Sequence, residues 1–210
     1  METYWSRYAR DLDHREAYVA GSDLIGLVTT KLNGLHRLGR VLELGCGTGA
    51  FTGSIAAAAD ELVATDYSSQ MIDAARALFA HIGNVRVEKA DAVNTGYPDG
   101  SFDTVFSANL IHVIPHPRRM LYEVRRVLRP GGLLILTCFT TDTMTIVDKL
   151  TLLYRYLRTF GPFPKGGTPF TLRSLSALIT AEGFTVEEAV LLGTATKSIF
   201  LLARKKAGAS

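Results

Sequence analysis

Segments with the character of β-strands alternate with segments of helical periodicity along most of this 210-residue chain. A continuous apolar run such as 131–139 is typical of a strand that is buried on both faces of a parallel sheet. The alternation therefore predicts a doubly wound α/β fold with helices on both faces of the sheet. The predicted strands are 40–44, 61–66, 84–91, 102–109, 131–139, 184–192 and 196–204, and the predicted helices are 50–59, 68–80, 118–128, 140–160 and 172–182.

Polar residues stand at the carboxyl ends of four predicted strands. They are Glu43, Asp66, Asp91 and Asn109. In an open α/β sheet, ligands bind in the crevice beyond the carboxyl ends of the strands. We therefore expect a single crevice to collect these four side chains.

The loop after the first strand, in the stretch RVLELGCGTGAF, is rich in glycine and leads into a helix. Gly45, Gly47 and Ala50 fit the relaxed dinucleotide pattern G-x-G-x-x-G/A, and Asp66 lies 66 − 45 = 21 residues after Gly45. This spacing allows an NAD(P)-dependent oxidoreductase. Backbone amides at a helix N-terminus favour an anion, so the loop alone leaves the nucleotide open.

The acids around the loop favour a different ligand. Glu43 precedes the first glycine by two residues, where a pyrophosphate would meet a negative charge, and Asp91 adds an acid at the neighbouring strand end. Carboxylates stabilise a ligand that carries positive charge and hydroxyl groups. S-adenosyl-L-methionine has an ammonium, a sulfonium and a ribose diol, and it has no phosphate. The acids therefore favour this ligand over NAD.

The motif VLELGCGTG resembles the first motif of the class I S-adenosylmethionine-dependent methyltransferases. The resemblance continues through ATDYSSQMIDAAR, KADA, YPDGSFDTVFSANLIHVI and LYEVRRVLRPGGLLIL. Upstream, YWSRYARDLD is similar to the N-terminal cap of the small-molecule branch that includes the ubiquinone and menaquinone biosynthesis methyltransferases. The resemblance implies a Rossmann-like, seven-stranded, mostly parallel sheet whose last strand is antiparallel. It also implies one domain over 1–210, with a helical cap over 1–35 and a helical lid over 140–170.

Matched to this family, the loop and the second strand receive roles on the donor. Gly45 and Gly47 are expected to let the backbone pass close to the methionine portion of the cofactor. Glu43 is expected to orient its ammonium group, and Asp66 to accept hydrogen bonds from the ribose hydroxyls. The expected product is S-adenosyl-L-homocysteine.

The same resemblance assigns residues to the adenine end. Tyr67 and Met71 would flank the ring, although a methionine at this point of an amphipathic helix can equally be core. Asp91 would accept from the adenine amino group while the Ala92 amide donates to the ring. Asn109 would lie beside the cofactor at the end of the fourth strand.

Two further residues are candidates for the reacting side of the site. Methyl transfer needs a general base only where the acceptor must lose a proton early. His112, in NLIHVI, is the candidate base, and the alternative is that it packs within its loop. Tyr8 either closes over the cofactor or packs the N-terminal helix on the body of the protein.

The acceptor is expected from the segment between Thr140 and Phe170, which is rich in leucine, tyrosine and phenylalanine. As a lid it would exclude water and favour an apolar, aromatic, quinone-like or lipid acceptor. The same side chains could instead form a homodimer interface. A third alternative is transient contact with a membrane surface, because Lys149, Arg155 and Arg158 interleave with the aromatic residues. A catalytically silent cofactor-binding subunit also remains open.

Composition narrows the remaining classes. The net charge of +3 argues against a nucleic-acid substrate. The sequence also lacks the Asn-Pro-Pro-aromatic signature of methyltransferases that act on nucleic-acid bases or glutamine amides. Neither Cys46 nor Cys138 has Cys or His neighbours at ligand spacing, so reduced thiols rather than a metal site are expected. The sequence shows neither an apolar run of membrane-spanning length nor a signal peptide, which predicts a cytoplasmic protein.

Overall fold

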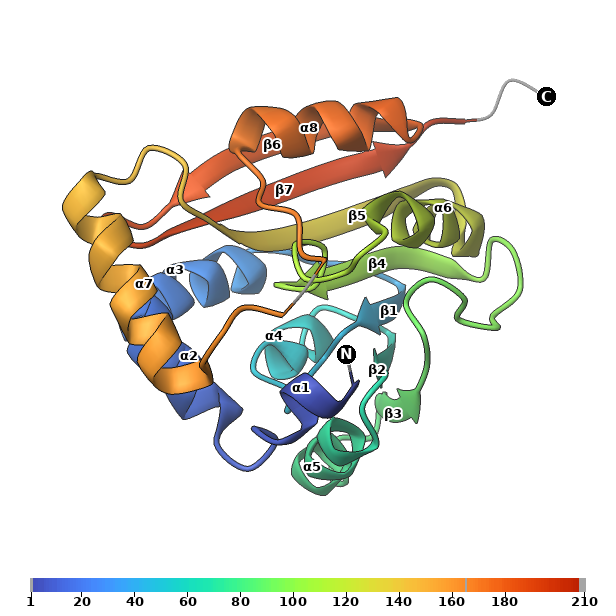
Figure 1. The fold of residues 1–210 in the computed structure, drawn as a ribbon. Coiled ribbons are helices and arrows are strands. Elements are labelled where there is room, and N and C mark those ends of the chain that lie inside the picture. The colour runs from blue at the N-terminus through green and yellow to red at the C-terminus, as the bar shows by residue number, and fades with distance from the viewer. Residues whose placement is uncertain (1, 165, 208–210) are drawn as a thin grey trace.

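The computed structural model describes residues 2–164 and 166–207, which form a seven-stranded sheet in the order β3-β2-β1-β4-β5-β7-β6 (Figure 1). Adjacent strands from β3 to β5 pair in parallel, and β7 runs antiparallel to both β5 and β6. The predicted doubly wound sheet with an antiparallel last strand is therefore confirmed. The strands are β1 (Arg40–Leu44), β2 (Glu61–Asp66), β3 (Val85–Lys89), β4 (Phe102–Ala108), β5 (Leu128–Thr140), β6 (Phe184–Leu192) and β7 (Lys197–Lys205).

Successive strand residues point to opposite sides of the sheet, so apolar side chains emerge on both faces. Helices cover both of these faces. Leu42 and Leu44 of β1 join a core with α6 and α8, whereas Val41 joins a second core with α3 and α4. Ala64 of β2 packs against α5. The helices are α1 (Glu2–Ser6), α2 (Leu12–Ala20), α3 (Ser22–Asn33), α4 (Thr52–Ala56), α5 (Ser69–Phe79), α6 (Pro117–Val127), α7 (Ile146–Phe160) and α8 (Leu172–Ala181).

Two helices are shorter than the sequence pattern predicts. The Asn84 side chain donates to the carbonyls of Ala56 and Ala59, so the alanine run after α4 is held as a turn. Residues 141–145 also form a turn, and α7 begins only after Thr145, whose hydroxyl accepts from the Asp148 amide. At α4 the Asn84 amide takes carbonyls at the end of the helix, and at α7 the Thr145 hydroxyl caps the first turn, so each side chain sets a helix boundary.

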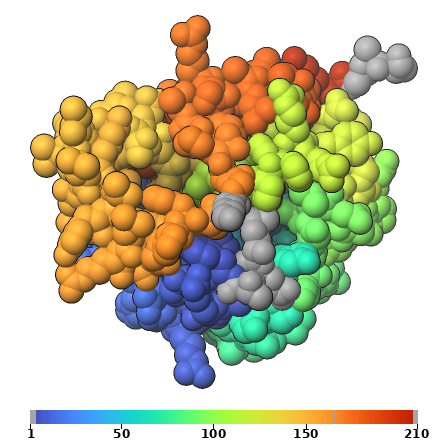
Figure 2. All heavy atoms as spheres, viewed as in Figure 1, coloured from blue at the N-terminus to red at the C-terminus, as the bar shows by residue number. Residues whose placement is uncertain are grey.

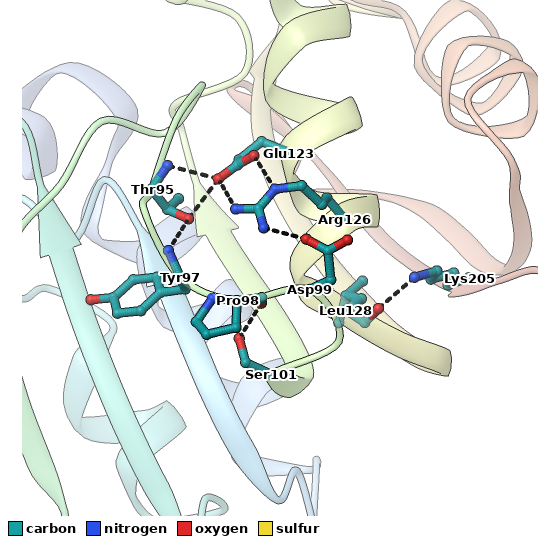
Figure 3. Close-up of polar contacts among 9 residues, drawn as sticks. All are labelled: Thr95, Tyr97, Pro98, Asp99, Ser101, Glu123, Arg126, Leu128 and Lys205. Atoms are coloured by element: carbon teal, nitrogen blue, oxygen red, sulfur yellow. Dashed lines mark hydrogen bonds and ion pairs between the residues drawn. The ribbon is translucent and has the colours of Figure 1, made fainter.

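The long connection between β3 and β4 is held by Glu123 of α6 (Figure 3). The Thr95 amide and hydroxyl donate to Glu123 at 2.7 and 2.6 Å, and Arg126 binds both Glu123 and Asp99. The hydrogen bond from Arg126 is the main reason that the pKa of the buried Glu123 carboxyl is lowered to about 2. This cluster fixes the connection that carries Asp91.

The helices α1 and α2 lie beside the carboxyl ends of the strands, and α7 packs against α2 (Figure 1). Tyr8, Leu12 and Val19 form a separate core with Met71 of α5 and Phe160 of α7. The Ser6 hydroxyl lies 2.7 Å from the Ser68 hydroxyl at the start of α5. The cap is thus joined to the sheet domain by apolar packing and by a polar contact.

Candidate active site

A cavity of about 430 Å³ lies at the carboxyl ends of β1, β2 and β4 and under α1 and α2. Its walls include the four strand-end residues that the sequence placed together. Nine of the eleven predicted site residues line it: Glu43, Gly45, Gly47, Asp66, Tyr67, Met71, Asp91, Ala92 and Asn109. The structure therefore gathers in one space residues that are up to 66 positions apart in the chain.

The glycine loop is tied to β2 by its backbone. The Gly45 and Cys46 amides both donate to the Thr65 carbonyl, at 2.8 and 2.9 Å. Gly49 has a φ of 105°, and a Cβ atom there would overlap the Phe79 ring. Only glycine accepts this backbone conformation without strain, so the loop's path over α5 requires it.

Glu43 is the most deeply buried acid of the site, with 2% of its surface exposed. The Thr52 hydroxyl donates to its carboxylate at 2.8 Å. Burial raises the pKa of Glu43 to about 7, and the negative charge of Asp66 adds to the effect. Burying a charge without a counter-charge is costly, so this carboxylate is stabilised by any cation that enters the cavity.

Asp66 organises the end of β2. One carboxylate oxygen accepts from the Gly47 amide at 3.0 Å, and the other accepts from the Ser68 amide at 2.8 Å. Tyr67 is half exposed, whereas Met71 is buried and also belongs to the core beneath the cap. Asp66 thus couples the glycine loop to the first turn of α5.

Asp91 and Asn109 each use a side-chain oxygen to shape a turn at the cavity. Asp91 accepts from the Val93 amide at 3.0 Å, just beyond the end of β3, which ends two residues earlier than expected. Asn109 adopts a φ of 53°, and its side-chain oxygen accepts from the Phe139 amide at 3.2 Å. Asparagine is one of the few residues other than glycine that tolerates this region.

Tyr8 and His112 do not line the cavity. The Tyr8 hydroxyl donates to the Phe160 carbonyl at 2.7 Å, and its ring packs edge-on against Phe160. The His112 Nδ1 lies 3.6 Å from the Cys138 Sγ, and burial lowers the pKa of His112 to about 4. In this arrangement both side chains pack within the protein, and their catalytic or binding roles stay predictions.

The cap supplies cavity residues that the sequence reasoning did not single out. Asp13 and Glu16 of α2 line the cavity beside Trp5 and Leu12. The Thr48 hydroxyl of the glycine loop donates to Asp13, and burial raises the pKa of Glu16 to about 7. Leu12, Asp13 and Glu16 are spaced so that they share one face of a helix. The sequence reasoning missed them because it predicted no helix boundary within the cap.

Neither Cys46 nor Cys138 forms a disulfide, and both thiols are buried. Within residues 2–164 and 166–207, no group of three His, Cys, Asp or Glu side chains has the arrangement of a metal site. No helix in these ranges is long and apolar enough to span a bilayer.

Residues 42–136 match the family model described as the methyltransferase domain. With this match, the fold and the acid-lined glycine loop support a class I S-adenosylmethionine-dependent methyltransferase domain over these residues, a class whose methyl donor is S-adenosyl-L-methionine. The chain is 34% identical over 110 residues to a demethylmenaquinone methyltransferase of Clavibacter sepedonicus, covering 52% of this chain and 45% of that relative. It is also 34% identical over 131 residues to a phosphatidylethanolamine N-methyltransferase of Cereibacter sphaeroides, covering 60% of this chain and 63% of the relative.

Among solved structures, a SAM-dependent methyltransferase from Aquifex aeolicus superimposes with a TM-score of 0.70 at 20% identity. The superposition covers 95% of this chain and 97% of that one, so the shared fold extends over nearly the whole chain. In sequence, the match spans only about half the length of the first curated relative.

Proposed function

We propose that this protein transfers a methyl group from S-adenosyl-L-methionine to a small apolar or aromatic acceptor by in-line displacement. One observation carries the proposal: the glycine loop and three acids, Glu43, Asp66 and Asp91, line one cavity. When bound, the donor supplies a methyl group on a positively charged sulfur, which a nucleophile attacks from the side opposite the sulfur. The protein's part is to hold donor and acceptor in line and to keep water out.

The cavity has features that fit this donor. Trp5 lines the cavity, and its indole nitrogen is buried without a hydrogen-bond partner in the described part of the chain. Gly45 has a φ of 73° and no room for a side chain against Leu110, so its backbone borders the cavity directly. Glu43 adds a buried acid whose ionised form needs a cation. An ammonium group meets this need, whereas a pyrophosphate would not.

The binding roles follow the family pattern. Glu43 would receive the donor's ammonium group while Gly45 and Gly47 border its methionine portion. Asp66 would accept from the ribose hydroxyls. At the adenine, Asp91 would accept and the Ala92 amide would donate, with the ring between Tyr67 and Met71 and with Asn109 on the side of the methyl group.

The apolar part of the cavity wall would hold the acceptor. Leu12, Leu110, Val113 and Ile114 contribute to this part. Two relatives are named for a quinone and for a phospholipid substrate, which supports an apolar, quinone-like or lipid acceptor here. No described residue of the 140–170 segment lines this cavity, so the lid over the acceptor stays a prediction.

A proton leaving the acceptor could go to His112 or to Glu16. His112 is largely neutral near pH 7 because its pKa is low, but its ring lies outside the cavity wall. Glu16 lies in the wall, and its raised pKa of about 7 suits a base that works near neutral pH. Glu16 is therefore the second candidate base, and replacing each residue in turn separates them.

Calorimetry with S-adenosyl-L-homocysteine and with NAD tests the donor. We expect the first to bind and the second not to bind. Asp66→Asn should weaken the binding by at least about tenfold, because two ribose hydrogen bonds to a charged acceptor are affected. Asp60→Asn, at an exposed acid outside the cavity, is the matched control.

A methyl-transfer screen over phenols, quinone precursors, amines and lipids tests turnover. NAD binding without S-adenosyl-L-homocysteine binding would refute the proposed donor. Binding of S-adenosyl-L-homocysteine with no transfer to any class of acceptor would favour the catalytically silent subunit.

A further inference from the structure

The helix α7 presents an apolar face that no other part of the described chain covers. We call Ile146, Val147, Leu150, Leu153, Tyr154 and Leu157 the outer face of α7. Between 39% and 77% of each of these side chains remains exposed. Single exposed leucines are ordinary on a protein surface, but six neighbouring apolar residues on one helix mark an interaction site.

The outer face is distinct from the face that holds α7 in place. Leu152, Tyr156 and Phe160 pack against the cap core formed around Tyr8 and Leu12. From Ile146, the outer residues recur at steps of one, four, seven, eight and eleven positions, which places them along one side of the helix. In Figure 2 the side chains of α7 form the left flank of the molecule. The helix is thus already packed on one side, and its exposed side needs another partner.

Positive charge accompanies this apolar stripe. Residues 146–160 contain Lys149, Arg155 and Arg158 against one acid, Asp148, so the helix carries 3 − 1 = +2. Arg158 donates to the Tyr154 hydroxyl at 3.1 Å, which places its charge at the border of the outer face. Arg155 lies over the ring of the exposed Tyr18, at 5.9 Å from the ring centre. Leucine and tyrosine beside lysine and arginine are typical of helices that lie in the headgroup layer of a membrane.

We propose that the outer face of α7 docks on an anionic lipid surface. The helix would lie in the plane of the bilayer, its apolar residues among the acyl chains and its basic residues at the lipid headgroups. A second copy of this chain is a less suitable occupant of the outer face. A two-fold contact through α7 would bring Lys149 and Arg158 of the two copies close together, and these like charges would repel. Since α7 packs on α2, the docked surface also lies beside the cap that covers the cavity.

Flotation with lipid vesicles tests the proposal on the full chain. We expect binding to vesicles of phosphatidylcholine with roughly a third phosphatidylglycerol, and at least roughly tenfold weaker binding to pure phosphatidylcholine. The double variant Leu150→Glu/Leu157→Glu should lose the binding. Leu78→Glu, the same change at an exposed leucine on α5, should keep it.

A second measurement shows which helix enters the bilayer. A polarity-sensitive dye on Leu150→Cys should report an apolar environment with anionic vesicles, while the dye on Leu78→Cys should not. Cys46 and Cys138 are buried and leave the labelling selective. The proposal is overturned if neither vesicle type binds, if the double variant binds like the parent, or if the parent is a dimer that the double variant dissociates.

Discussion

The substitution Glu43→Gln is expected to stabilise the ligand-free protein while it weakens donor binding. The Glu43 carboxyl is buried, and its pKa in the folded state is about 7 against an ordinary value of 4.5. At about 1.4 kcal/mol for each pH unit, this difference amounts to about 3 kcal/mol. Glutamine keeps an oxygen that can accept from the Thr52 hydroxyl, so most of this free energy should be recovered.

The direction in which this stability gain changes with pH follows from the raised pKa of Glu43. A carboxyl whose pKa is raised by folding costs nothing below pH 4.5, where it is protonated in both states. As the pH rises from 4.5 to about 7, the unfolded chain loses its proton first, and the free energy of unfolding falls. Above pH 7 the full cost is present. The gain from Glu43→Gln should therefore be small at pH 5 and largest at pH 8.

Urea denaturation of the parent and the variant at pH 5 and pH 8 measures both values. Calorimetry with S-adenosyl-L-homocysteine on the same samples should show the opposite trend, with weaker binding by the variant. Equal stability of the two proteins at pH 8, or a gain that does not change with pH, would refute the burial argument. Unchanged ligand affinity would instead refute the contact between Glu43 and the ammonium group.

Four further substitutions test the fold and the site. Glu123→Gln should lower the free energy of unfolding by up to about 3 kcal/mol at pH 7, and by progressively less as the pH falls from about 5 towards 2. The reason is that folding lowers the pKa of this buried carboxyl from 4.5 to about 2, and denaturation across this pH range measures the effect. Gly49→Ala should destabilise the protein by about 3 kcal/mol through overlap with Phe79 and a disallowed φ, whereas Gly26→Ala, at an open position in α3, should stabilise it by about 0.5–1 kcal/mol; thermal unfolding of both variants decides. Glu16→Gln should lower turnover of any acceptor found in the screen by about 10²-fold or more and remove the acid limb near pH 7, with S-adenosyl-L-homocysteine binding unchanged, and a retained limb would exclude Glu16 as the base.

The alternating apolar pattern and the strand-end polar residues were sufficient to predict the sheet and the strand-end side chains that line one cavity. The reason is geometric, since parallel strands joined by helices bring their carboxyl ends to the same edge. Glu43, Asp66 and Asp91 could therefore be assigned to one crevice from their positions alone. The resemblance to class I methyltransferases then added the role of each residue on the donor.

Tertiary packing decided the rest. The sequence left His112 open between a catalytic base and packing within its loop. The fold places its ring beside Cys138, while α2 carries Asp13 and Glu16 into the cavity. No local signal reports the angle at which a cap helix lies on a sheet, because that angle depends on contacts such as Tyr8 with Phe160, 152 residues apart. Likewise, only the tertiary structure distinguishes the packed face of α7 from its exposed face. Periodicity marks apolar side chains along a helix, and contact with distant residues determines which of them are buried.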